Sequence, residues 1–222
     1  MKKEWLAQIA TLIKKEINLE WRIKFAISGI LLYVVSTVFT AYLSFKIIPN
    51  PAVWNALMWI ILLFASVNAV AKSFVQENAG RQLYLYTLVA PQPLIIAKII
   101  YNALLLVLIS LLTYLIYSIF IGDIVQDKSY FLITLILGAT GFSSVMTLVS
   151  AISAKAGNNS TLMAILSFPI LLPMLLLLIK ISKNAIDGID HSINNPYLLV
   201  LIMMNIIVLV LAYILFPYLW RE

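Results

Sequence analysis

The stretch IIYNALLLVLISLLTYLIYSIFI, from Ile99 to Ile121, contains no Asp, Glu, Lys or Arg. A helix needs roughly 20 apolar residues to cross the hydrocarbon core of a bilayer. This stretch is long enough, and nothing in it would carry a charge into lipid. We therefore predict a transmembrane helix over residues 99–121 and compare the rest of the chain with it.

Five further stretches have a similar length and apolar character. They are Phe25–Phe45, Val53–Ala71, Tyr130–Ala154, Leu162–Ile181 and Tyr197–Leu219. Backbone groups inside a bilayer must find their hydrogen-bond partners within the protein, and only helices and closed barrels achieve this. The alternation that barrel strands require is missing from the sequence. The sequence therefore predicts an all-α membrane protein with six transmembrane helices.

The composition of the whole chain agrees with a membrane domain. Of its 222 residues, 63% are hydrophobic and 11% are charged, and the mean hydropathy is +1.03. Soluble domains are about 45–50% apolar and about 25% charged. The lack of cysteine excludes disulfides, thiolate nucleophiles and Cys-ligated metal. We predict one transmembrane domain over residues 1–222, surrounded by membrane lipid and without a nucleic-acid partner.

The basic residues predict the orientation of the helices. With the N-terminus inside, eleven of the 15 Lys and Arg residues fall on the inner side and four on the outer side. The inner ones are Lys2, Lys3, Lys14, Lys15, Arg22, Lys24, Lys72, Arg81, Lys98, Lys155 and Arg221, and the outer ones are Lys46, Lys128, Lys180 and Lys183. Because Lys and Arg are enriched in cytoplasmic loops, we expect both termini in the cytoplasm.

Residues 1–24 differ from the apolar segments because they mix charged and apolar residues. At helical spacing one broad face carries Trp5, Leu6, Ile9, Leu12, Ile13 and Ile17. This pattern predicts an amphipathic helix in the membrane interface, with its lysines facing anionic lipid. Glu16 and Glu20 project near the apolar face. They either pair with Lys24 or Arg22 on the helix surface or contact another protein segment.

Small and polar residues indicate which helices pack against protein. The second segment carries Asn55, Ser66 and Asn68, and the fourth carries Gly138, Gly141, Ser143, Ser144 and Ser150. Residues of these types gather where transmembrane helices meet. No segment has a charged residue near its centre, which argues against a proton- or sodium-driven carrier.

Two prolines, Pro169 and Pro173, lie within the fifth segment. Each removes a backbone donor and kinks the helix, and neighbouring helices can satisfy the freed carbonyls. Two interpretations stay open. The prolines form either a fixed kink or a hinge that bends during transport.

Catalytic motifs are missing from the sequence. None of the seven glycines belongs to a G-x-x-x-x-G-K-[ST] loop that would cradle phosphate. We therefore expect no ATPase site and no bound cofactor in this chain, and ATP can act only through a partner subunit. His191 is the only histidine and lies in the predicted outer loop Ser182–Pro196. One imidazole cannot build a metal site, so His191 is either solvated or an axial contact to haem.

The connection Lys72–Lys98 is the longest between two predicted spans, and the charge rule places it in the cytoplasm. Its first part, to about Val89, can form a helix, which Pro91 and Pro93 would end. It mixes charged residues with apolar ones, and we expect Phe74 and Tyr84 to be exposed. We predict a coupling segment that receives a push from a soluble ATPase through Phe74, Glu77, Gly80, Arg81, Tyr84, Pro91 and Pro93.

Several motifs along the chain resemble the CcmB family, also called haem exporter protein B. The main one is Phe74-x-x-Glu77-x-x-Gly80, followed by Leu88, Pro91-x-Pro93 and Ala97-Lys98. The others are Lys15-Glu16 with Trp21-Arg22, Gly141-Phe142 followed by Ala151–Ala156, and Phe168-Pro169-Ile-Leu-Leu-Pro173. Their order and spacing, with the length and six-helix layout, extend the resemblance over essentially the whole chain.

The resemblance implies an ABC-2-like exporter permease that acts in cytochrome c maturation. It implies a separate CcmA-like ATPase, CcmC- and CcmD-like haem-handling proteins, a CcmE-like haem chaperone outside, and paired permease subunits in a bacterial inner membrane. Haem is then a substrate, and the permease either exports it or helps to release the loaded chaperone. A permease of a generic ABC-2 exporter for lipid-linked polysaccharide or a drug is the alternative.

Overall fold

The structure is a computed structural model that describes residues 2–23, 25–45, 50–70, 74, 89–156 and 160–221. Within these ranges the chain forms seven helices and no strand. They are α1 (Lys2–Ile23), α2 (Phe25–Ser44), α3 (Pro51–Val70), α6 (Pro91–Ile121), α7 (Lys128–Lys155), α8 (Ser160–Ile186) and α9 (His191–Arg221).

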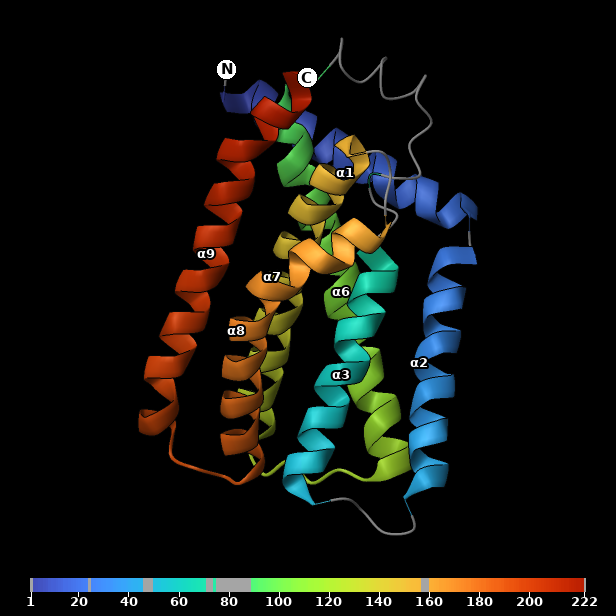
Figure 1. The fold of residues 1–222 in the computed structure, drawn as a ribbon, viewed down its shortest axis with the longest axis vertical. Coiled ribbons are helices and arrows are strands. Elements are labelled where there is room, and N and C mark those ends of the chain that lie inside the picture. Colours follow the sequence, from blue (N-terminus) through green and yellow to red (C-terminus); the bar gives the residue numbers. More distant parts are fainter. Residues whose placement is uncertain are drawn as a thin grey trace.

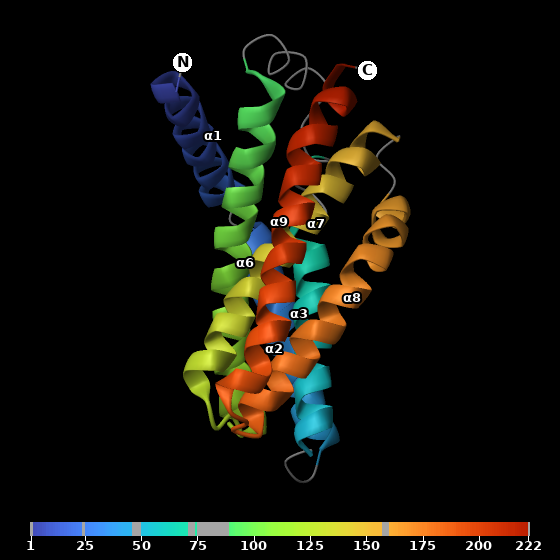
Figure 2. The same ribbon diagram turned by 90° about the vertical axis from the view of Figure 1, so that its left-hand side faces the viewer.

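Six helices, from α2 to α9, run alternately up and down the long axis of the molecule (Figure 1). Helix α1 lies across one end of this bundle, and both chain termini lie at that end. Figure 2 shows α1 beside the upper part of α6. We call this end the α1 end, and the end that contains Phe45, Asn50, residues 122–127 and residues 187–190 the opposite end.

Five of the helices are long and apolar enough to cross a membrane: α3, α6, α7, α8 and α9. Each contains most or all of a stretch that the sequence predicts as a span. The first predicted span, Phe25–Phe45, coincides with α2, whose described apolar part, Ser28–Ser44, is shorter than the other five.

Helix α6 begins earlier than the sequence predicts, at Pro91 in place of Ile99. Ala90 has extended backbone angles, φ −68° and ψ 147°, and the two prolines occupy the first turn of the helix. A proline costs little there because the first N–H groups of a helix have no partner within the helix. Pro91 and Pro93 therefore start a helix, and Lys98 lies inside it.

Helix α7 forms the centre of the bundle. Its residues from Gly141 to Ser150 are all buried, so the packing predicted from the fourth segment is confirmed. Gly138 allows a close approach, since a Cβ atom there would lie 2.8 Å from the Trp59 ring of α3. The prediction for the second segment also holds for Asn55 and Ser66, which are buried, whereas Asn68 is exposed.

Helix α8 contains both Pro169 and Pro173 and is nevertheless continuous. Its first part runs obliquely to the rest in Figure 1. Such a bend is what prolines inside a helix produce. The hinge interpretation stays a prediction.

Candidate functional site

A second hydrophobic cluster lies at the α1 end, apart from the main core of the bundle. It brings together four helices and one residue of the long connection. Its buried members are Ile9, Leu12, Phe74, Leu94, Ile95, Ala97, Ile99, Leu148, Ala151, Ala212 and Phe216. We call it the α1 cluster. Part of the apolar face of α1 is therefore covered by protein, while Leu6 and Ile17 of the same helix are exposed.

Lys98 carries a charge into the α1 cluster. Its side chain is only 1% exposed, and its Nζ lies 3.4 Å from Oε1 of Glu16 on α1. The same Nζ sits 4.5 Å from the centre of the Phe74 ring. A buried ammonium is costly unless it is paired, and the carboxylate and the electron-rich ring face both favour the cation. Lys98 thus holds together α1, α6 and the start of the long connection.

The carboxylates of Glu16 and Glu20 on α1 both face α6. Glu16 contacts Lys98 and also lies 3.3 Å from Nζ of its neighbour Lys15. One turn further along α1, Glu20 faces the Tyr101 side chain of α6. Contact with another protein segment, one of the two interpretations, is therefore present in the structure. The side chains of Arg22 and Lys24, on which the other interpretation depends, lie outside the described residues.

The expectation that Phe74 is exposed is wrong. Its side chain is 4% exposed, and its ring lies 5.6 Å from that of Phe216 near the end of α9. Packing inside the protein leaves little of it for a partner. Pro91 is half-buried and Pro93 is buried at the start of α6. The other proposed coupling residues, Glu77, Gly80, Arg81 and Tyr84, lie outside the described residues.

Sequence reasoning missed Lys98 as a site residue. It counted the lysine among the cytoplasmic charges of a loop, because a charge interrupts an apolar window. The signal that could have identified Lys98 is the pair of glutamates on the apolar face of α1. Carboxylates there need a cation from another helix once that face is covered.

His191 lies at the opposite end, as the first residue of α9. Its side chain is 61% exposed, yet it has partners. Its Nε2 hydrogen-bonds to the carboxylate of Asp127, and its ring stacks on Tyr130 with centroids 4.7 Å apart. The Tyr130 hydroxyl donates to Oδ1 of Asn195 at 3.0 Å. His191 therefore connects α9 to the start of α7.

Asp127 is the cap of α7, and its side chain accepts the backbone N–H of Tyr130 at 3.0 Å. This bond and the adjacent His191 ring hold the pKa of the Asp127 carboxyl below its usual range. No group of three or more Asp, Glu and His side chains in the described part of the chain could hold a metal ion. The structure leaves the haem-contact hypothesis for His191 untested.

A polar cluster joins α3 to α8 inside the bundle. Nε1 of Trp59 donates to the Ser182 hydroxyl at 2.8 Å, and Nδ2 of Asn55 donates to the Ile179 carbonyl at 2.8 Å. The Ser182 oxygen also lies 2.8 Å from Oδ1 of Asn55. These groups satisfy one another, which is the arrangement expected for polar residues between membrane helices. We assign the cluster to helix packing.

A groove of about 520 Å³ runs between α2 and α3. Hydroxyl groups from α2 line it on one side, among them those of Thr37, Thr40 and Ser44. All three donate to carbonyl groups one turn earlier in their own helix, at 2.7–2.8 Å. These three hydroxyls are therefore satisfied within α2.

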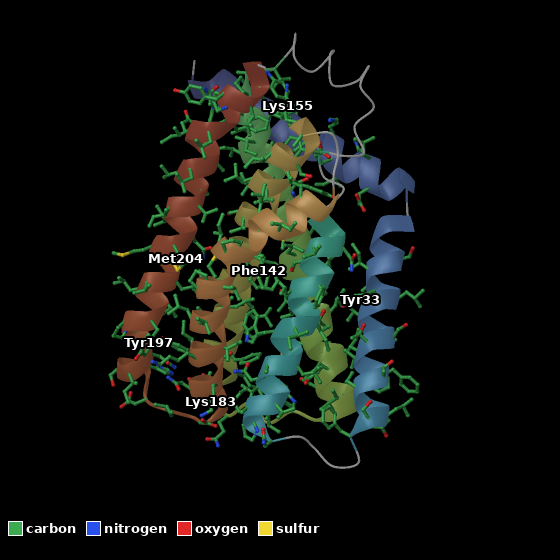
Figure 3. All side chains as sticks on the ribbon, in the orientation of Figure 1. Tyr33, Phe142, Lys155, Lys183, Tyr197 and Met204 are labelled. Atoms are coloured by element: carbon green, nitrogen blue, oxygen red, sulfur yellow. The ribbon has the colours of Figure 1, made fainter. Side chains whose placement is uncertain are left out.

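Charged side chains mark the two ends of the bundle. Figure 3 shows Lys155 at the α1 end and Lys183 at the opposite end, while Phe142 points into the interior. The fold and the site together define a multi-pass helical membrane protein. Its buried charge lies at one end of the bundle, where α1 and the long connection meet the spanning helices.

Over residues 7–218 the chain matches the family described as CcmB protein, and it belongs to that family. The chain is therefore a membrane component of a haem-exporting ABC system for cytochrome c maturation. No curated protein matches the chain.

Proposed function

We propose that the chain is the ABC-2-like permease subunit of a complex in the bacterial inner membrane. In this proposal α2 is a sixth span, α1 lies in the cytoplasmic interface, and both termini are cytoplasmic. A separate CcmA-like ATPase supplies the energy, since the sequence has no phosphate-binding loop. The permease works in pairs and with CcmC-, CcmD- and CcmE-like proteins.

The α1 cluster is the observation that carries this proposal. Phe74 stands at the beginning of the long connection, and Pro91 at its end opens α6. Through Phe74 the connection packs on α6 and α9 as well as on α1. A push on the connection would therefore reach several helices of the bundle at once, which is what a permease driven by a soluble ATPase requires.

The distribution of basic residues supports the orientation. Eleven of the 15 basic residues fall on the inner side when the N-terminus is placed inside. Lys155 and Lys183, which the charge rule assigns to different sides, lie at different ends of the bundle (Figure 3). The α1 end is therefore the cytoplasmic end in this proposal.

The transported entity is haem, or the energy is used to release a haem-loaded chaperone at the outer surface. The opposite end of the bundle, with His191 and Asp127, would face that chaperone. The family match over residues 7–218 favours this role over a generic exporter of polysaccharide or drug.

Affinity purification of the tagged chain from native membranes tests the proposal. We expect an ATPase and a haem-handling membrane protein to copurify, and ATP hydrolysis to appear only in preparations that contain the ATPase. Hydrolysis by the isolated, contaminant-free chain would overturn the assignment.

A variant pair tests where the ATPase docks. Apolar anchors supply most interface energy and rim charges supply little. Tyr84→Ala should therefore weaken ATPase binding by about 2–4 kcal/mol, or roughly 30- to 1,000-fold. Arg81→Ala should weaken it less. Equal retention of the ATPase by Tyr84→Ala and the unaltered chain would argue against docking on this segment.

A further inference from the structure

Lys98 is the only charged side chain that is buried among the residues whose exposure the structure describes. Its 1% exposure keeps it from headgroups and water, so the orientation signal rests on the other ten inner basic residues. Lys98 lies near one end of α6 and is paired with Glu16. A residue of an ion pathway would instead lie midway along a span. A different role is required.

Added stability is a weak explanation for the Lys98–Glu16 pair. A buried ion pair is often no more stabilising than well-packed apolar residues of the same volume, and its best-attested use is to fix one arrangement among alternatives. Here the alternatives are positions of α1 relative to α6. The ammonium fixes one of them through Glu16 at 3.4 Å, and it fixes the start of the long connection through the Phe74 ring at 4.5 Å.

The next residues of α6 connect this joint to the centre of the bundle. The carbonyl of Ile99 accepts a hydrogen bond from Ser143 of α7 at 2.9 Å. One turn further, Nδ2 of Asn102 donates to the Thr147 hydroxyl of α7 at 2.8 Å. A displacement of α6 at Lys98 is therefore passed to α7, the most buried of the five long apolar helices.

We propose that Lys98 is a positioning residue that couples the long connection and α1 to α6. A displacement of the connection beyond Phe74 is passed through the Lys98 ammonium to α6 and then to α7. Helix α1 moves with them. This inference rests on the proposed function, in which an ATPase pushes on that connection. The inference adds that the push enters the bundle through Lys98.

The decisive variant is the apolar pair Glu16→Leu with Lys98→Met, which keeps the volume and removes both charges together. If the Lys98–Glu16 pair had only a structural role, this apolar replacement would leave function unchanged. We expect the chain to accumulate and the purified complex to hydrolyse ATP at near wild-type levels. Holocytochrome c formation should fall by about 10-fold or more, within the usual range of coupling between sites. Lys14→Met, at an exposed lysine of α1, is the matched control and should behave as wild type.

A charge exchange provides the second measurement. Lys98→Glu alone places two carboxylates together and should abolish holocytochrome c formation, whereas Glu16→Lys with Lys98→Glu should restore a large part of it. Full activity of the apolar pair would overturn the proposal. Failure of both the apolar pair and the exchanged pair to accumulate would also overturn it, because Lys98 would then be a folding residue.

The wild-type complex separates this inference from the proposed function. If no ATPase copurifies with the unaltered chain, the proposed function fails, whatever the variants do. If the ATPase copurifies and the apolar pair still forms holocytochrome c at the wild-type rate, only the role of Lys98 fails.

Discussion

Replacing Ser182 by alanine tests how much the polar cluster between α3 and α8 stabilises the bundle. The change removes the acceptor of the Trp59 indole N–H and the hydroxyl beside Oδ1 of Asn55, each at 2.8 Å. Hydrogen bonds between membrane helices contribute about 0.6 kcal/mol on average and at most about 1.7 kcal/mol. The Ser182 hydroxyl has one proton, for which Oδ1 of Asn55 competes with the Leu178 carbonyl of the same helix at 2.5 Å. Only the indole bond therefore counts in full, and the expected loss is about 1–2 kcal/mol.

Ser144→Ala is the matched control for this prediction. Ser144 is also buried in the bundle, but its hydroxyl bonds only to the Thr140 carbonyl of its own helix at 3.0 Å. Such back-bonding does not stabilise a helix, so its loss should change stability very little. The assay is equilibrium unfolding of the purified chain in mixed micelles, followed by tryptophan fluorescence. If the two variants unfold at the same denaturant fraction, the reasoning from interhelical bonds is refuted.

Three further predictions follow from the topology and the packing. Reporter fusions at Glu222 and Asp187 should report opposite compartments, and the same compartment for both would contradict six crossings. His191→Ala should leave holocytochrome c formation largely intact, because the exposed ring is held by Asp127 and not by a buried site; complete loss at normal protein level would instead indicate a haem contact. Gly138→Ala should cost about 1–3 kcal/mol by overpacking against an indole ring 2.8 Å away, and Gly29→Ala, which meets open space, should cost far less in the same unfolding assay.

The five long apolar helices were predictable because lipid imposes one simple requirement, a long apolar run. Local chemistry marks two of the helix starts in the structure, which the predicted spans placed two residues too late. Asn50 caps α3 by accepting the N–H of Val53 at 2.9 Å, and Asp127 caps α7. The start of α6 was harder, since Pro91 is compatible both with the end of one helix and with the first turn of the next.

The α1 cluster could not be derived from any local pattern. Phe74 and Phe216 are far apart in the sequence, and their contact depends on how α6 and α9 pack. The amphipathic pattern of α1 predicts an apolar surface, but it does not distinguish lipid from protein as the covering. Only the two glutamates on that surface indicated protein as the covering, and Lys98 is the cation that pairs with Glu16.

The pairing of Glu16 with Lys98 also has a consequence for synthesis. The two residues are 82 positions apart (98 − 16), which at about 5–20 residues per second separates their translation by roughly 4–16 s. During that interval α1 has no α6 to pack against, so Glu16 has no Lys98 to pair with. Attachment of α1 through this pair therefore has to wait for the synthesis of α6. Nascent chains that end before Lys98 should leave α1 open to protease, and longer ones should protect it.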